Sequence, residues 1–291
     1  MLLTFESYTL QTKNLASALD LPFQVLKEHK FPDGESKLTL PPELPEKVAF
    51  CVSLNNPNEK LVELMLAAKT ARQLGAKEIT LVAPYMCYMR QDIAFQPGEV
   101  VSQTIVGEFL ANYFDNVITV DPHLHRISHL SQAIPVTHAL SLTAAESMGS
   151  FIAERFQSPV ILGPDVESLQ WVQQVAGPHS WQHDVCSKTR FGDREVSIVL
   201  PDLALDGQHV ILVDDVASSG QTLAVAAKGC FERGAASVDV IVTHALFVEQ
   251  AESLVLQTGV GNVWSTDSVT HHTNAIPLAN LLANSLKSLF F

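Results

Sequence analysis

Residues 210–222 read Val210-Ile211-Leu212-Val213-Asp214-Asp215-Val216-Ala217-Ser218-Ser219-Gly220-Gln221-Thr222. An apolar, β-branched run ends in two adjacent acids, and small residues then lead into a helical pattern at 222–233. This order places backbone N–H groups beside a helix N-terminus, which is a favourable site for a phosphate. Asp214 and Asp215 are poorly suited to bind the phosphate itself. They could instead accept hydrogen bonds from the hydroxyls of a sugar attached to it, or bind a hydrated divalent ion. The stretch predicts a ribose-phosphate site; the alternative is an ordinary strand–helix turn with an acidic cap.

Apolar strand-like runs alternate with helical patterns on both sides of this stretch. The strand-like runs are 48–53, 79–83, 117–120, 160–162, 210–213 and 238–243, and the helical patterns are 61–74, 103–113, 144–156, 169–176 and 222–233. This rhythm predicts an α/β fold with mostly parallel sheets flanked by helices. Ligands of such sheets bind beyond the carboxyl ends of the strands, where we expect Asp214 to lie.

A weak internal repeat indicates two similar halves, with chance similarity as the alternative. Residues 48–82 align without gaps on residues 207–241, and this overlay superimposes Gly75 on Gly234, each at the end of a helix. The same overlay sets Asn55-Asn56 against the two acids, so that the first copy of the loop has lost them.

The repeat and a polar helix start near residues 141–143 divide the chain into expected domains. An N-terminal domain is expected at 1–142 and a C-terminal domain at 143–276. An amphipathic helix at 277–291 follows. Its single lysine, with no arginine, favours packing on a domain or a neighbouring subunit over binding to a membrane.

The composition excludes several classes of protein. The chain has 291 residues, of which 47% are hydrophobic, and a net charge of −13 at pH 7. The acidic balance argues against nucleic-acid and membrane-surface binding, because no basic field is present to neutralise phosphates. Small anionic ligands stay possible, since local amides, cations and metal ions outweigh a distant net charge.

The cysteines and the N-terminus indicate a cytoplasmic protein. The four cysteines form no CxxC pair, which is typical of the reduced cytosol; they are Cys51, Cys87, Cys186 and Cys230. Residues 1–6 lack the features of a signal peptide. No apolar run approaches the roughly 18 residues of a membrane-spanning helix.

Two further motifs follow expected strands. Asp121-Pro122-His123 could bind a divalent ion at the end of 117–120, or could be a capping acid and a surface histidine. Arg90-Gln91-Asp92 comes after 79–83, and an arginine donates in pairs to phosphate oxygens. An exposed, ion-paired arginine is the alternative.

Two more motifs carry an aromatic ring or cations. Phe31-Pro32-Asp33-Gly34-Glu35 offers a ring and acceptors that could hold a nucleobase, although an ordinary β-turn has the same composition. In Lys188-Thr189-Arg190, an extended backbone would put both cations on one side. Two fixed cations could stabilise the negative charge of a phosphoryl group during its transfer. The alternative is that both side chains lie in solvent at the edge of a strand and bind nothing.

Taken in order with Gly163-Pro164-Asp165, these motifs resemble those of ribose-phosphate diphosphokinases, the synthetases of phosphoribosyl diphosphate (PRPP). The resemblance covers nearly the whole chain, and the run 95–102 is similar to the archaeal-type branch. It implies two domains like type I phosphoribosyltransferases, and transfer of the diphosphoryl group of Mg-ATP to the 1-hydroxyl of ribose 5-phosphate, giving PRPP and AMP. It also implies Mg²⁺ as cofactor, ATP and ribose 5-phosphate as ligands, and a homo-oligomer, a dimer or higher.

The resemblance further implies a role for each motif residue. ATP would be bound by Phe31, Asp33, Glu35, Arg90, Gln91, Asp92 and His123. Ribose 5-phosphate would be bound by Asp214, Asp215, Ser218, Ser219, Gly220, Gln221 and Thr222. The catalytic cations would be Lys188 and Arg190, and the metal ligands His123, Asp121 and Asp165.

The loop also departs from the common pattern of the family. Ser218 stands where many relatives carry a third acid, and Gln221 where glycine is usual. We expect an ordinary φ at Gln221, which changes the loop's shape. Two alternatives stay open: a type I phosphoribosyltransferase that consumes PRPP, and a non-catalytic, synthetase-like regulatory subunit. The presence of Lys188, His123 and Asp214 favours the synthetase.

Overall fold

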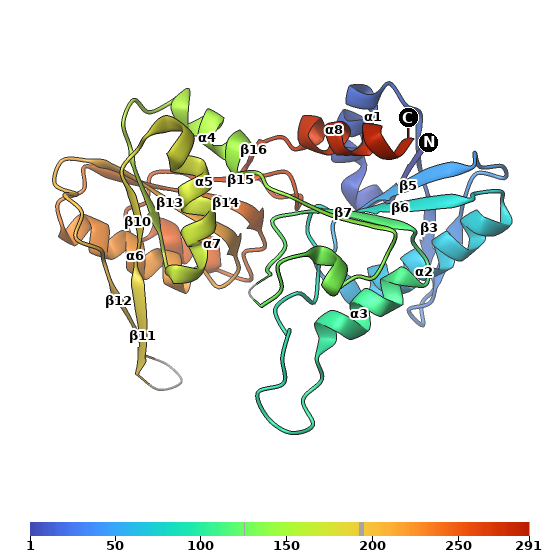
Figure 1. Ribbon diagram of the computed structural model, residues 1–291, viewed down its shortest axis with the longest axis horizontal. Helices are drawn as coiled ribbons and strands as arrows, with labels where there is room; N and C mark the ends of the chain where they lie inside the picture. The colour runs from blue at the N-terminus through green and yellow to red at the C-terminus, as the bar shows by residue number, and fades with distance from the viewer. Residues whose placement is uncertain (125, 192–194, 291) are drawn as a thin grey trace. The chain divides into compact units, whose positions relative to one another are not determined.

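The computed structural model describes residues 1–124, 126–191 and 195–290, and of residues 188–191 and 195–197 the backbone alone. The chain forms two compact units, Met1–Leu142 with Pro277–Phe291, and Thr143–Ile276. Figure 1 shows a central sheet with helices packed against it in each unit. In the described part of the chain, no helix is long and apolar enough to cross a membrane.

The first unit is built on a six-stranded sheet in which every pairing is parallel, in the order β2-β1-β5-β6-β7-β8. Its strands are β1 (Leu2–Thr4), β2 (Phe23–Val25), β5 (Lys47–Cys51), β6 (Glu78–Val82), β7 (Asn116–Val120) and β8 (His138–Leu142). The central strands are buried on both faces and read as continuous apolar runs, as parallel strands covered by helices do. A separate antiparallel hairpin joins β3 (Lys27–Lys30) to β4 (Ser36–Thr39).

Helices cover both faces of this sheet (Figure 1). They are α1 (Thr9–Leu19), α2 (Pro57–Gln73), α3 (Ser102–Ala111) and α8 (Ala279–Phe290), with short 3₁₀ turns η1 (Glu6–Tyr8) and η2 (Leu130–Gln132). The C-terminal helix α8 packs against α1 through a face that includes buried Leu282 and Leu286. The last segment of the chain therefore completes the first unit.

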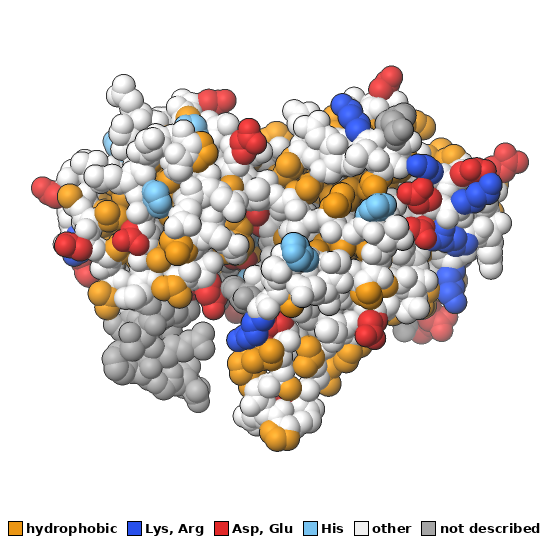
Figure 2. Space-filling model, in the orientation of Figure 1, with side chains coloured by type: hydrophobic (Ala, Val, Ile, Leu, Met, Phe, Trp, Pro, Cys, Tyr) orange, Lys and Arg blue, Asp and Glu red, His pale blue; other side chains and the backbone are white. Residues whose placement is uncertain are grey.

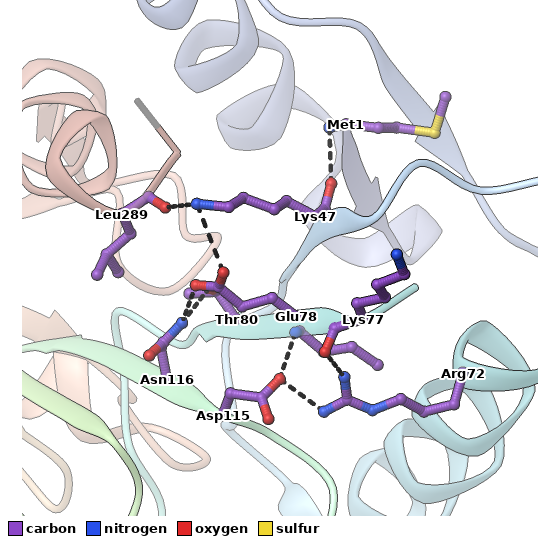
Figure 3. Close-up of polar contacts among 10 residues, drawn as sticks. Met1, Lys47, Arg72, Lys77, Glu78, Thr80, Asp115, Asn116 and Leu289 are labelled. Atoms are coloured by element: carbon purple, nitrogen blue, oxygen red, sulfur yellow. Dashed lines mark hydrogen bonds and ion pairs between the residues drawn. The ribbon is translucent and has the colours of Figure 1, made fainter. Parts of the chain in front are cut away.

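Polar side chains tie together the amino ends of β5, β6 and β7 (Figure 3). Asp115 accepts hydrogen bonds of 2.6 Å from the Ile79 amide and from Arg72. Lys47 donates to the Leu289 carbonyl of α8 at 2.7 Å and lies 3.4 Å from Glu78. This network holds the edge of the sheet that is opposite to the carboxyl ends of the strands.

The second unit repeats the same plan. Its parallel sheet has the order β10-β9-β13-β14-β15-β16, with strands β9 (Val160–Gly163), β10 (His183–Val185), β13 (His209–Ala217), β14 (Ser237–Ala245), β15 (Val263–Thr266) and β16 (Asn274–Ile276). Its helices are α4 (Ala145–Ala153), α5 (Leu169–Ala176), α6 (Gln221–Glu232) and α7 (Ala251–Leu256), with turns η3 (Val166–Ser168) and η4 (Gly177–His179). A hairpin of β11 (Ser187–Phe191) and β12 (Glu195–Val199) again follows the second strand of the unit.

The predicted α/β architecture of mostly parallel sheets flanked by helices is therefore confirmed. The two sheets have one strand order, and both hairpins stand at the same point of it. Each unit also has its own hydrophobic core, made chiefly by the inner sides of its central strands and the helices next to them.

The gapless overlay of the two halves is correct at one end and wrong at the other. Gly75 and Gly234 both take positive φ, +111° and +83°, after the helix. Strand pairing, however, joins Cys51 to Val82 and Val213 to Ile241, whereas the overlay had matched Val213 with Leu54. The true counterparts of the two acids are thus Val52 and Ser53. The gapless overlay fails there because α2 has 17 residues and α6 only 12.

Candidate functional site

The two acids of the second unit lie inside a strand rather than beyond its end. β13 was expected to stop at Val213, but it continues to Ala217 because the long neighbour β14 keeps pairing with it, from Asp214 with Val242 to Ala217 with Ala245. On its other side β9 pairs only as far as Leu212. Beyond that point the edge of β13 borders the turn that follows β9.

Asp214 is the most perturbed acid among the described residues. Burial raises its pKa well above the ordinary value of 3.8, and the charges of Asp215 and Asp165 raise it further. Asp215 is 4% exposed, and its amide donates to the Asp214 carboxylate at 3.0 Å. Asp165 caps η3 by accepting from the Glu167 amide at 3.1 Å. The fold thus concentrates three carboxyls at the carboxyl ends of β9 and β13, an arrangement that favours a bound cation or hydroxyl donors.

The loop after β13 turns sharply at Gly220 to begin α6. Gly220 has φ +69°, and a Cβ added there would lie 2.6 Å from the Ala251 carbonyl oxygen. Gln221 is the first residue of α6 and has ordinary φ, so the positive φ needed for this turn falls on the glycine before it. The first turn of a twelve-residue helix, with its outward-facing amides, consequently begins at the loop, as an anion site requires.

A second segment braces this loop from behind. The amides of Phe247 and Val248 donate to the carbonyls of Ala217 (2.9 Å) and Ser218 (3.1 Å). Ser218 is half-buried and Ser219 is exposed. The loop is therefore held by backbone contacts while the Ser219 side chain faces solvent.

The predicted cations of the second unit lie on β11. Lys188 pairs with Ile198 and Arg190 with Val196 across the hairpin, so that both occupy alternate positions of one extended strand. Their side chains lie outside the described residues, and the predicted roles of Lys188 and Arg190 stay predictions.

In the first unit, Asp121 occupies an unusual backbone position directly after β7. Its φ is +39°, it is 5% exposed, and its amide donates to the Leu142 carbonyl at 2.8 Å. His123, two residues on, is half-buried. Aspartate is one of the few residue types that adopt positive φ readily, and this conformation turns the chain away from the sheet directly after β7.

The three side chains of the Arg90-Gln91-Asp92 motif lie in different surroundings. Arg90 is exposed, whereas Gln91 turns back to donate to the Ile93 carbonyl at 3.0 Å. The Asp92 side chain is only 3% exposed and pairs with Arg126 at 2.5 Å. Arg126, which sequence reasoning missed, also lies 5.8 Å from the centre of the Phe95 ring. It follows the 117–120 strand by several residues, and no spacing signal connects it to Asp92.

The β3–β4 turn carries Phe31, Asp33 and Glu35, but the Phe31 ring packs against His29, 4.9 Å between ring centres, and is not part of the pocket that the two acids line. The Glu35 amide donates to the Asp33 carboxylate at 3.2 Å, and Gly34 has φ +94°. Asp33 and Glu35 line a pocket of about 630 Å³ together with Gly34, Ser36, Asn58, Glu59, Val62 and Leu66. Lys30 holds the hairpin to α2 through a 2.5 Å pair with Glu59.

The loop before α3 leaves apolar side chains in solvent. Figure 2 shows hydrophobic side chains gathered where this loop and α3 reach the lower end of the first unit. The large exposed ones in this part of the chain are Phe95, Val100 and Ile105. An apolar surface of this kind is typical of a binding or assembly surface.

Lys60, in the first turn of α2, reaches back to the loop that follows β5, the first unit's counterpart of the loop after β13. Its ammonium donates to the Ser53 carbonyl at 2.7 Å and to the Asn55 carboxamide at 2.8 Å. Burial lowers its pKa below the usual value. Where the second unit has acids, the first unit thus has Val52, Ser53 and an internal cation, which explains physically why this copy of the loop lacks the charge pattern of the other.

Family comparisons cover both units. Residues 1–113 match the family described as the N-terminal domain of ribose phosphate pyrophosphokinase, and residues 138–256 match the phosphoribosyl transferase domain.

Individual relatives align over nearly the whole chain. The ribose-phosphate pyrophosphokinase of Methanopyrus kandleri is 34% identical over 281 residues, covering 95% of this chain and 95% of that protein. Ribose-phosphate pyrophosphokinase 2 of Archaeoglobus fulgidus is 32% identical, with 93% of each chain covered.

The fold also matches a solved structure. The crystal structure of phosphoribosylpyrophosphate synthetase from Mycobacterium smegmatis has a TM-score of 0.85 and 22% identity, and the match covers 100% of this chain and 98% of that one. Because the sequence identity is only 22%, this match shows a common fold and no more. Together with the full-length relatives, it means that this chain belongs to the ribose-phosphate pyrophosphokinase family.

Proposed function

We propose that the protein transfers the β,γ-diphosphoryl group of ATP to the 1-hydroxyl of ribose 5-phosphate, forming PRPP and AMP. The hydroxyl oxygen attacks the β-phosphorus, the bond from that phosphorus to the α,β-bridging oxygen breaks, and the hydroxyl proton is lost. The observation that carries the proposal is the β13–α6 loop, in which two acids precede a tight Gly220 turn and a helix N-terminus. The names of the full-length relatives support the same reaction.

The second unit would bind the acceptor sugar. Asp214 and Asp215 would accept hydrogen bonds from the ribose hydroxyls, and the loop from Ser218 to Thr222 would hold the 5-phosphate with its amides and hydroxyls. Ser218 in place of an acid lowers the negative charge beside that phosphate. Proximity and orientation of the hydroxyl supply much of the rate in phosphoryl transfer.

The first unit would bind ATP. The exposed guanidinium of Arg90 suits phosphate oxygens, and the Phe31 ring with Asp33 and Glu35 suits adenine. Gln91 and Asp92 would act differently, since their side chains turn into the protein and shape the loop that presents Arg90.

Mg²⁺ is the cofactor that the donor set fits. Asp165, Asp214 and Asp215 offer oxygen atoms, and the raised pKa of Asp214 indicates that a nearby positive charge would relieve repulsion. Asp121 and half-buried His123 would contribute in the first unit. When bound, Mg²⁺ neutralises charge on the phosphate chain.

We also propose a homo-oligomer, dimer or higher, and a cytoplasmic location. The exposed apolar residues Phe95, Val100 and Ile105 support an assembly surface. All four cysteines are free and buried, and burial raises the thiol pKa of each to about 12, which fits a reducing compartment.

The reaction is tested by incubating purified protein with Mg-ATP and ribose 5-phosphate and following the products by phosphorus NMR. PRPP and AMP in equal amounts are the expected products. ADP instead of AMP would show a simple kinase and overturn the proposal. Release of diphosphate from PRPP that depends on an added base would show a phosphoribosyltransferase, and absence of turnover would show a regulatory subunit.

Lys188→Ala tests the predicted catalytic cation. Loss of one electrostatic contact to the transferred group is expected to lower kcat by about 10²–10³. Binding of ribose 5-phosphate, measured by calorimetry, is expected to stay unchanged. Turnover near the wild-type value would remove Lys188 from the mechanism.

A further inference from the structure

We propose that Glu252, His271 and His272 form a binding site for a divalent transition-metal ion of the zinc class. Among the described residues, they are the one group whose nitrogen and carboxylate atoms all lie within 4.8 Å of one another. All three belong to the second unit, and none of them is used by the proposed reaction.

The geometry is close to that of a three-ligand zinc site. His272 Nε2 lies 2.9 Å from Glu252 Oε1, and His271 Nε2 lies 4.0 Å from Glu252 Oε2. Zinc–ligand bonds of about 2.0–2.2 Å in a tetrahedron put neighbouring ligand atoms about 3.3–3.6 Å apart. Small rotations of the side chains would therefore bring the three atoms around one ion, with a fourth position left for water.

The donor set selects the metal. Two imidazole nitrogens and one carboxylate suit zinc, cobalt, nickel or copper, whereas Mg²⁺ prefers oxygen ligands.

A supporting contact positions His271. Its Nδ1 lies 2.8 Å from the Thr273 hydroxyl, which in turn lies 2.8 Å from the Ser265 hydroxyl; the Thr273 amide is farther from the ring, at 3.4 Å. The Thr273 amide donates to Nδ1 as the ring now stands, so binding of an ion at Nε2 would require the ring proton to move to Nδ1, with the Thr273 hydroxyl as its acceptor. Metal-bound histidines have a partner of this kind.

The turn that carries both histidines is itself held in place. The Asn274 carboxamide accepts from the His271 amide at 2.9 Å and donates to the carbonyls of Thr266 (2.6 Å) and Val269 (3.0 Å). Glu252 belongs to α7, a different element. An ion at this site would thus join α7 to the turn between β15 and β16.

The experiment uses the full chain with Co²⁺ as a coloured probe and Zn²⁺ for calorimetry, in excess Mg²⁺ to occupy oxygen sites. The variants are Glu252→Gln, His271→Asn and Thr273→Val. His179→Asn is the matched control, because His179 is exposed in the same unit and stacks on Trp181. Circular dichroism and PRPP synthesis establish that each variant is folded.

We expect one tight Co²⁺ or Zn²⁺ ion per wild-type chain and per His179→Asn chain. Glu252→Gln and His271→Asn should weaken binding by at least about 100-fold, and Thr273→Val by about 10–100-fold. Zn²⁺ at a hundred times its Kd should raise the unfolding temperature of the wild type by about 5–10 °C. Absence of a tight ion in the wild type, or equal affinity in every variant, would overturn the proposal.

Discussion

At the scale of single residues, Asp214 shows that the proposed substrate site is unfavourable for the free protein. Burial and the charges of Asp215 and Asp165 raise its pKa, so its ionised form is disfavoured in the folded state. The folded state therefore binds the Asp214 proton more tightly than the unfolded state does. The resulting stabilisation is complete at a pH below the pKa of the unfolded chain, and it is lost as the pH rises through the pKa of the folded protein. Near neutral pH, the free protein therefore carries an electrostatic cost that a ligand would relieve.

Asp214→Asn is expected to raise the unfolding temperature at neutral pH by roughly 2–5 °C while abolishing PRPP synthesis. The gain should shrink as the pH falls toward the ordinary value of 3.8, because Asp214 then becomes neutral in the wild type as well. Calorimetry across this pH range measures the difference. Asp202→Asn, at an exposed acid, is the control, and an equal gain in both variants would contradict the explanation.

Gly220 and Gly207 allow two causes of strain to be separated. Both have positive φ, +69° and +70°, but a Cβ on Gly207 meets nothing within 4 Å, whereas one on Gly220 meets the Ala251 carbonyl. Gly207→Ala should cost about 1–2 kcal/mol. Gly220→Ala should cost about 1–3 kcal/mol more and raise KM for ribose 5-phosphate. Equal costs in urea unfolding would show that the contact with Ala251 is unimportant.

At the scale of elements, the Asp92–Arg126 pair fixes the loop before α3. Asp92 Oδ2 is buried and has no hydrogen-bond partner among the described residues, so Arg126 is important for neutralising this carboxylate.

Arg126→Met should destabilise the fold by about 1–3 kcal/mol, because it leaves a buried acid without its cation. This loss of stability is at the lower end of the range for buried ion pairs, because the Arg126 side chain is 48% exposed. If this loop presents Arg90 to ATP, KM for ATP should rise several-fold while KM for ribose 5-phosphate stays the same. Steady-state kinetics measure both KM values. The control is Arg155→Met, which removes an exposed arginine just after α4. An unchanged KM for ATP would separate this loop from nucleotide binding.

The sequence predicts long, strongly patterned elements well and short ones poorly. The helical patterns at 103–113 and 222–233 correspond to α3 and α6 within two residues at each end. The three-residue strands β1, β2, β10 and β16 were missed, because three residues show neither alternation nor an apolar run. The length of β13 was also missed, since it depends on a partner strand far away in the sequence.

At the scale of the whole molecule, the candidate site could be predicted as far as the resemblance of its motifs to a known family reached. The internal repeat predicted two similar units, and both sheets do have one strand order. The turn of Asp92 toward Arg126 and the position of Lys60 could not be predicted, because each depends on side-chain contacts across the fold. The register error at Val52 arose because α2 has 17 residues and α6 only 12, a difference that an overlay without gaps cannot allow for.

The C-terminal helix should stabilise the first unit specifically. Leu286 on α8 is fully buried, and α8 packs on α1. Leu286→Ala is expected to cost about 2–4 kcal/mol, whereas Lys287→Ala at an exposed neighbour should cost little. Hydrogen exchange should accelerate in β1 and β5 and stay unchanged in β13 and β14. Faster exchange throughout 143–276 would contradict this division.

The contrast between the two loops has a consequence for the lifetime of the protein. In the first unit, the Lys60 ammonium binds its loop through a backbone carbonyl and a carboxamide, and that loop has no acids to repel one another. In the second, the charges of Asp215 and Asp165 disfavour the ionised form of Asp214, so Mg²⁺ and ribose 5-phosphate bound as proposed would stabilise that unit by mass action. Proteases cut the opened state of a protein, and they should therefore cleave the second unit first when the sugar phosphate is scarce. The abundance of the enzyme would then follow the supply of its own substrate.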